Sequence, residues 1–143
     1  YVSATKWLSS IELTSWEREG YWVPRGWAQQ APIKTQSRIG YPRQNDVLTA
    51  GPNKIAGVAW AQGRGIEKVE VRVDDGPWQA ATLATDVSDD TWRQWVVDWD
   101  ASLGNHTLTV RATDKTGDTQ TEERTPVAPD GATGHHSVKV KVR

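Results

Sequence analysis

Three histidines are the side chains of this sequence best suited to act as metal ligands or acid–base groups near neutral pH. His135 and His136 are neighbours, so on a strand their imidazoles point to opposite faces and make a poor pair of metal ligands. His106 follows a turn. Surface and strand-end roles fit these histidines better than metal binding.

Aspartates gather in two polar segments, and each has an ordinary structural use. Asp86, Asp89 and Asp90 lie between expected strands, and residues 114–118 (DKTGD) resemble a loop that could hold calcium. The spacing does not match a twelve-residue calcium loop, and no glutamate stands where a bidentate ligand is needed. Asx-type turns are the favoured interpretation, and we expect no metal site in this chain.

Catalytic constellations are not evident in the sequence. The chain has no cysteine, which excludes disulfides, zinc fingers, iron–sulfur clusters and thiol nucleophiles. We find no Ser/His/Asp order, glycine-rich phosphate loop or isolated carboxylate pair. The chain by itself is therefore not expected to catalyse a reaction, and no cofactor is expected within it.

Composition favours a globular protein. Of the 143 residues, 36% are hydrophobic, and 17 Lys+Arg against 18 Asp+Glu give a net charge of −1. That balance argues against a nucleic-acid binder, which needs a basic face. No apolar run approaches the roughly 20 residues of a membrane span. The chain has no methionine and starts at Tyr1, so we expect it to be part of a longer protein.

Short alternating stretches predict an all-β fold for residues 32–143. Strands are expected over 54–61, 66–74, 78–83, 92–99, 107–113 and 138–142. Turn signals are Asp74-Asp75-Gly76 and Gly104-Asn105, and residues 119–130 read as a long loop. About seven short strands without helical periodicity indicate a β-sandwich. We expect Trp60, Trp95 and Trp99 in its core.

Residues 1–31 form a separate, aromatic-rich part. They contain one alternating stretch, Trp7–Leu13, which predicts a single strand, and a strand cannot stand alone. This part is either an arm packed on the second part or the tail of a preceding domain, and the second interpretation is favoured. Trp22 and Trp27 flank Pro24-Arg25-Gly26 in a loop that could bind a sugar or a partner, but contact between two domains of one chain is preferred.

Several segments together resemble one enzyme family. Lys54–Leu83 contains GVAWA, then Gly65-Ile66, Val69-Glu70-Val71, Asp75-Gly76 and Trp78, and is similar to the C-terminal domain of sulfite oxidases. Further similarities follow the same order: Thr5-Lys6-Trp7-Leu8, Thr35–Ile39, Trp92-Arg93-Gln94-Trp95, Ala112-Thr113-Asp114 with Gln120, and His136-Ser137-Val138. The resemblance covers nearly the whole chain through the order and spacing of its parts.

The resemblance implies a fold and a role. The fold is an immunoglobulin-like (E-set) β-sandwich, known as the molybdenum-cofactor oxidoreductase dimerisation domain, here residues 32–143. Residues 1–31 would be the tail of the molybdopterin-binding domain and a linker. The family's molybdenum ligand is a cysteine, so it would lie upstream. The expected function is a non-catalytic dimerisation and scaffold domain of a molybdopterin oxidoreductase, with the upstream catalytic domain and a second copy as partners.

Single residues carry finer implications of the resemblance. Lys6 corresponds to a family lysine near the pterin, and Trp7, Trp22, Arg25 and Trp27 would contact the preceding domain or another partner. Sulfite-oxidising relatives have Arg-Gly where this chain has Asp130-Gly131, and a carboxylate repels an anion, which disfavours sulfite as substrate.

The linker at residues 21–27 is similar to that of a membrane-attached bacterial branch. Any link to the membrane would then run through the parent protein, and this domain would lie on the extracytoplasmic face of the bacterial cell membrane.

A stand-alone binding module is the alternative. A sandwich that binds carbohydrate or a cell-surface partner could use Trp22, Trp27 or Trp78. The absence of methionine favours the dimerisation domain, because a self-contained secreted module rarely needs a truncated, aromatic-rich first strand.

Overall fold

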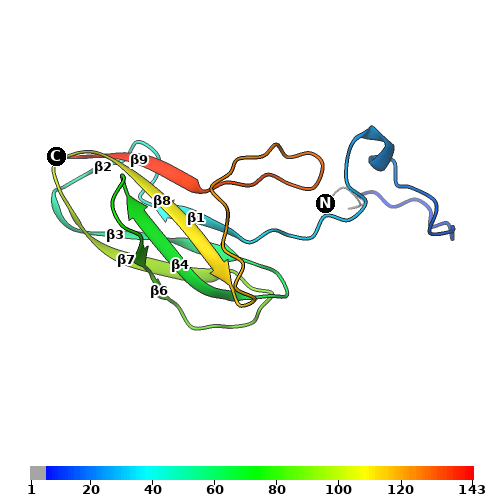
Figure 1. Cartoon of the computed structure of the whole chain (residues 1–143), viewed down its shortest axis with the longest axis horizontal. Helices are drawn as coiled ribbons and strands as arrows, with labels where there is room; N and C mark the ends of the chain where they lie inside the picture. The colour runs from blue at the N-terminus through cyan, green and yellow to red at the C-terminus, as the bar shows by residue number, and fades with distance from the viewer. Residues whose placement is uncertain (1–5) are drawn as a thin grey trace.

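Two sheets pack face to face over residues 36–142 in the computed structural model, which describes residues 6–143 (Figure 1). One sheet has the order β1(Gln36–Tyr41), β3(Gly51–Trp60), β7(Arg93–Ala101), β6(Thr82–Leu83). The other has the order β2(Val47–Leu48), β9(His136–Val142), β8(Gly104–Asp114), β4(Ile66–Val73), β5(Gln79–Ala80). All neighbours are antiparallel except β2 and β9. The predicted all-β, immunoglobulin-like sandwich is confirmed.

The core consists of alternate side chains from both sheets, as strand periodicity requires. In β4, Val69 and Val71 are buried, whereas Lys68, directly before Val69, is exposed and Glu70, between the two valines, is partly buried. The same alternation buries Leu108, Val110 and Ala112 in β8 and Val138, Val140 and Val142 in β9. The Asp-Gly turn is also as predicted, because the Gly76 amide donates to the Val73 carbonyl at 3.0 Å.

The tryptophans divide between the core and the surface. Trp95 and Trp99 are buried as expected. The prediction that Trp60 lies in the core is wrong, because Ile55 and Ala59 of β3 fill the inward positions and leave Trp60 on the opposite parity. Its indole stacks on Trp92 instead, with ring centroids 5.4 Å apart and planes 7° apart.

The segment expected to be one strand over 78–83 is two short strands in different sheets. β5 pairs with β4, and β6 pairs with β7 across the sandwich. Between them the Ala81 amide donates to the Val69 carbonyl at 2.8 Å. Ala81 and Leu83 pack against the core while the chain changes sheets, which apolar alternation alone does not reveal.

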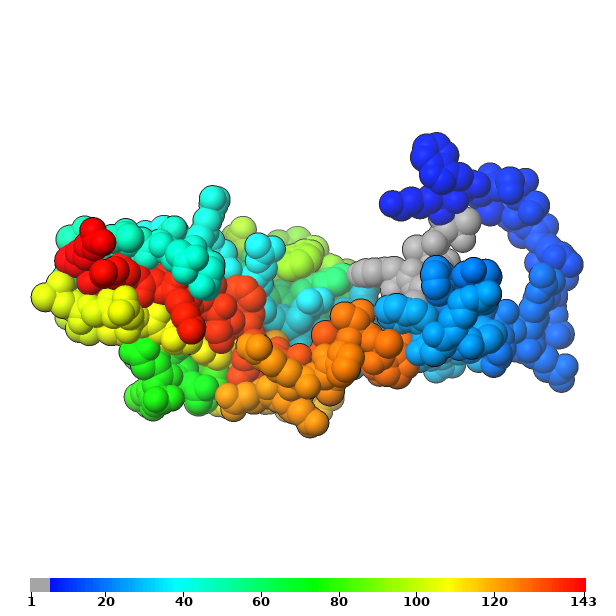
Figure 2. Space-filling model, turned by 90° about the horizontal axis from the view of Figure 1, so that it is seen from above, coloured from blue at the N-terminus to red at the C-terminus, as the bar shows by residue number. Residues whose placement is uncertain are grey.

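Residues 6–35 contain no strand, so the strand predicted over 7–13 is wrong. The physical reason is that a strand needs a hydrogen-bonded neighbour, and no described segment pairs with it. Apart from one turn of 3-10 helix, η1(Val23–Arg25), these residues form turns and irregular chain. Figure 2 shows this blue segment at the end of the molecule remote from the C-terminal strand.

Residues 6–143 contain no helix with the length and apolar character that a bilayer span requires.

Thr5, the first residue of the Lys-Trp-Leu match, lies outside the described residues, as do the first four residues of the extension predicted over 1–31.

Candidate functional site

The extended segment 6–26, called the arm from here on, presents large apolar side chains to solvent. Trp7 is 96% exposed and Trp16 is 98% exposed, and Leu13 between them is equally uncovered. An isolated exposed tryptophan is ordinary in a folded protein, but several large apolar side chains exposed on one segment are typical of an interaction surface. The arm is therefore the first candidate surface, and Lys6 lies on it, exposed beside Trp7.

The aromatic loop predicted to contact a partner is a compact turn around η1. The Arg25 guanidinium lies 3.7 Å from the centre of the Tyr21 ring, and its Nη1 donates to the Tyr21 carbonyl at 2.7 Å. Tyr21 packs edge-on against Trp22 at 5.0 Å, and the Trp27 amide donates to the Trp22 carbonyl at 3.3 Å. The structure thus brings Trp22, Arg25 and Trp27 together. Trp7, on the extended part of the arm, is not among the contacts of this turn.

Residues between the arm and β1 contact the end of the long loop 119–130, which is irregular chain as predicted, apart from one bridge at Thr119. The Ala28 amide donates to the Pro129 carbonyl at 2.9 Å. Further on, the Lys34 ammonium contacts the Asp130 carboxylate at 3.0 Å and the Gly131 carbonyl at 2.7 Å. The Asp130 carboxylate is therefore paired with the Lys34 ammonium of the same chain.

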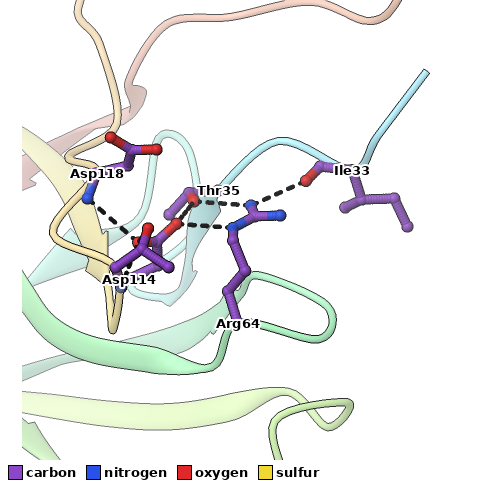
Figure 3. Close-up of polar contacts among 6 residues, drawn as sticks. Ile33, Thr35, Arg64, Asp114 and Asp118 are labelled. Atoms are coloured by element: carbon purple, nitrogen blue, oxygen red, sulfur yellow. Dashed lines mark hydrogen bonds and ion pairs between the residues drawn. The ribbon is translucent and has the colours of Figure 1, made fainter. Parts of the chain in front are cut away.

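A buried carboxylate connects the start of β1 with two loops of the sandwich (Figure 3). Asp114 at the end of β8 accepts hydrogen bonds from the Thr35 hydroxyl at 2.7 Å and from Arg64 Nε at 2.9 Å. The Arg64 Nη2 donates to the Ile33 carbonyl at 2.9 Å. Residues 33–35 are thereby fixed to the sandwich, so the arm leaves it in a defined direction.

Electrostatics make this junction strong. Burial of the Asp114 carboxylate opposes its charge, but hydrogen bonds from Thr116, Arg64 and Thr35 outweigh burial and hold its pKa well below the usual range. The Asp118 amide adds a bond to the same carboxylate at 3.2 Å. The sequence pattern suggested Asx-type turns for residues 114–118, and Asp114 makes them, but its role at the junction was missed. A lone arginine between two glycines, at 63–65, was the available signal.

The other titratable groups singled out in the sequence make structural contacts. Asp86 and Asp89 lie in reach of the 114–118 loop, but the Lys115 ammonium lies between them, 3.0 Å from an Asp86 oxygen. A fixed cation there would repel a metal ion. His106 pairs with Asp74 at 2.8 Å, and the Ile39 amide donates to His136 Nδ1 at 3.2 Å.

The donor set of residues 6–143 does not fit a molybdenum centre. These residues contain no group of three or more metal-ligating side chains, and the whole chain lacks the thiolate that the family resemblance requires. Lys6 is a solvent-exposed cation. No chemical step through the cofactor can therefore be assigned to residues of this chain.

Trp78, offered for sugar binding in the alternative hypothesis, is already covered by cations. Guanidinium groups of Arg111 and Arg72 lie 4.2 and 4.8 Å from its ring centre, and His135 packs against it edge-on at 5.5 Å. A sugar that stacked on this indole would have to displace a favourable cation–π contact. This arrangement argues against the binding-module hypothesis at that position.

Comparisons with known proteins give one matching family. Residues 27–142 match the family model described as the Mo-co oxidoreductase dimerisation domain. The match begins at Trp27 and covers the sandwich with its long loop. The comparison with curated proteins gives no match.

Solved structures with similar folds agree with the architecture. The sulfane dehydrogenase SoxCD from Paracoccus pantotrophus matches with a TM-score of 0.59 and 24% identity, over 75% of this chain and 30% of that one. The fibronectin(III)-like modules of Clostridium thermocellum CbhA match with a TM-score of 0.50 and 21% identity, over 77% of this chain and 97% of that one. The chain thus spans less than a third of the dehydrogenase chain. At these identities the matches establish the fold.

Proposed function

The chain belongs to the family of Mo-co oxidoreductase dimerisation domains, and we propose that it follows the molybdopterin-binding domain of a larger oxidoreductase. In this role it pairs two subunits and braces the catalytic domain, and the intact parent transfers an oxygen atom or electrons at molybdenum. The cofactor and its cysteine ligand belong to the preceding part of that parent.

The observation that carries this proposal is the uncovered arm. Trp7, Leu13 and Trp16 expose nearly their whole side chains, while the sandwich beside them has a complete core. Burial of one such aromatic side chain contributes about 1.5–3 kcal/mol, so an arm of several has a strong tendency to find a partner. A preceding domain of the same chain, held next to the arm by covalent linkage, is the partner with the highest local concentration.

Finer features of the parent follow from single segments. We propose that it is similar to sulfite oxidases, that Lys6 lies near the pterin, and that its substrate is other than sulfite because Asp130 stands where an anion-binding arginine is expected.

The aromatic linker at 21–27 supports a bacterial, membrane-attached parent with this domain on the extracytoplasmic face. Fusion of alkaline phosphatase after Arg143 tests the location: an active reporter supports it, and an inactive, well-expressed reporter contradicts it.

The test of the function uses the complete gene product beside the 143-residue chain. We expect the complete protein to contain molybdenum and pterin, measured by elemental analysis and by pterin fluorescence, and to be dimeric by light scattering. Deletion of residues 36–143 should convert it to a monomer that keeps its molybdenum. A complete protein without molybdenum, or one whose subunit pairing survives the deletion, would contradict the proposal.

A further inference from the structure

The two outer faces of the sandwich differ in chemistry. On the five-stranded sheet, the outward side chains of β4, β8 and β9 are polar or charged. Five of them are basic and one is acidic: Lys68, Arg72, Arg111, Lys139 and Lys141, and Glu70. Glu70 pairs with Lys68 and Arg111, and Arg72 pairs with Glu122, so the charge that remains unpaired among the described residues is that of Lys139 and Lys141. Two copies of this face pressed together would place like charges opposite each other, which is unfavourable.

The outer face of the four-stranded sheet has an apolar centre. Strand register places Val58 of β3 between Arg38 of β1 and Gln94 of β7. In the neighbouring row, Ala56 lies beside Val96, which in turn lies beside Thr82. Ala56, Val58 and Val96 remain partly exposed, so no other described part of the chain covers them fully.

A groove runs over this centre. It has a volume of about 460 Å³, and the residues of β1, β3, β6 and β7 that line it include Gly40, Ala56, Val58, Thr82 and Val96. Small side chains and a glycine at its floor let another surface approach the sheet closely. The stacked pair Trp60–Trp92 lies on the same face, next to the end of β3.

The charges around this centre are balanced. Outward side chains on the same sheet are two cations, Arg38 and Lys54, and two anions, Asp98 and Asp100. Lys54 and Asp98 already form an ion pair with each other. In a two-fold interface the same patch meets itself, so a neutral, mixed-charge rim around an apolar centre is better suited to pairing than a face with a net positive charge.

We propose that two copies of this chain pair through the outer face of the β1-β3-β7-β6 sheet, called the pairing face from here on. The inference rests on the proposed dimerisation function and adds to it the surface that performs it. The strands of this sheet have 6, 10, 9 and 2 residues, and at about 3.3 Å per residue and about 4.8 Å between strands they cover roughly 430 Å² of sheet. A stable interface takes about 800 Å² from each partner. The loop with Trp92 must therefore contribute, or pairing of the isolated chain is concentration-dependent.

Single cysteines test the pairing face cleanly because the chain has none of its own. Arg38→Cys and Gln94→Cys place a thiol on either side of Val58, and the matched control Lys139→Cys places an exposed thiol on the other outer face. With a short bismaleimide at low protein concentration, we expect covalent dimers from Arg38→Cys and Gln94→Cys and only monomer from Lys139→Cys. Dimers from the control alone would overturn the inference.

A charge substitution gives an independent measurement. Val96→Glu adds an anion at the centre of the pairing face, and we expect it to raise the dimer dissociation constant by about tenfold or more in sedimentation experiments. Lys139→Glu, on the opposite face, should leave the constant unchanged. Circular dichroism must show both variants folded; Asp98→Lys, which disturbs only the exposed rim, replaces Val96→Glu if that variant unfolds.

The outcomes separate the surface from the function. A wild-type chain that dimerises while Arg38→Cys, Gln94→Cys and Val96→Glu behave like the controls would refute the pairing face and leave the dimerisation function intact. A wild-type chain that stays monomeric at millimolar concentration, with no crosslinking at any position, would refute pairing by this domain itself.

Discussion

Asp114 shows how one side chain can join distant parts of the chain. Its carboxylate is completely buried, yet it remains charged because it accepts bonds from the Thr35 hydroxyl, the Arg64 guanidinium and the Thr116 hydroxyl. Such charge-assisted bonds inside a protein are stronger than neutral ones, and removal of one partner leaves the other buried without compensation.

We therefore expect Asp114→Asn to lower the free energy of unfolding by about 2–4 kcal/mol, because the partly buried Arg64 guanidinium loses its counter-charge. Urea denaturation monitored by tryptophan fluorescence measures the change. Asp118→Asn is the matched control, since it removes the same charge from an exposed side chain and should change stability by less than about 0.5 kcal/mol. Equal effects of the two variants would contradict the role assigned to Asp114.

Two histidines are expected to affect stability in opposite directions with pH. The hydrogen bond to Asp74 raises the pKa of His106 above its usual 6.5, despite partial burial. Burial, with Arg38 nearby, lowers the pKa of His136 below 6.5, and the neutral ring accepts the Ile39 amide. His106 therefore stabilises the fold fully below 6.5 and less as pH rises through its folded pKa. His136 stabilises it above 6.5 and less as pH falls.

We predict that His106→Gln lowers the free energy of unfolding, relative to wild type, more at about pH 5.5 than at about pH 8.5. Asp74 is ionised over this whole range, so the difference reports the charge of His106. His136→Gln should show the reverse order. Urea midpoints at the two pH values measure both differences. A pH-independent loss in His106→Gln would show that its ion pair with Asp74 does not form in solution.

At the scale of elements, the close approach of β1 and β3 depends on Gly57. A Cβ at this position would lie 1.9 Å from the Arg38 carbonyl oxygen and 2.6 Å from the Trp95 ring. The Trp95 indole thus fills the core space that a side chain would otherwise occupy, and the bulge of β1 between Ile39 and Tyr41 follows directly after this contact.

Gly57→Ala should consequently lower the free energy of unfolding by about 1–3 kcal/mol, because the methyl group must displace backbone or the buried indole. Thermal unfolding and the near-ultraviolet circular dichroism of tryptophan report the change. Gly40→Ala is a matched control in β1, where the nearest atoms lie at 3.8 Å, an ordinary contact. Equal changes in the free energy of unfolding for the two variants would contradict the close packing of Trp95 against Gly57.

On the scale of the whole molecule, the sandwich and the arm differ in how they are held in place. The sandwich has a continuous core from both sheets, whereas the arm is joined to it by the contacts at Ala28 and residues 33–35. Figure 2 shows the arm next to the orange loop 119–130 and away from the body of the sheets. The arm therefore contributes surface for a partner more than stability to the sandwich.

Deletion of residues 1–26 tests this division. We expect the shortened chain to unfold with a free energy within about 0.5 kcal/mol of the complete chain, since the side chains of residues 6–26, the described part of the removed segment, are mostly exposed. Differential scanning calorimetry and urea denaturation both measure it. A shortened chain that fails to fold, or loses as much stability as a core substitution, would show that the arm is part of the domain.

The sequence by itself determined the fold class, the core of β4, β8 and β9, and the Asp-Gly turn, because alternation with period two is a local property of the chain. The family resemblance also followed from segments in order. Tertiary structure alone decided the position of Trp60, since both faces of Lys54–Ala61 carry apolar residues and only the opposing sheet selects one. It likewise decided the division of residues 78–83 between two sheets and the junction at Asp114, whose partners Thr35 and Arg64 are 79 and 50 residues away in the sequence. Contacts over such distances depend on how the sheets are stacked, and no local pattern contains that information.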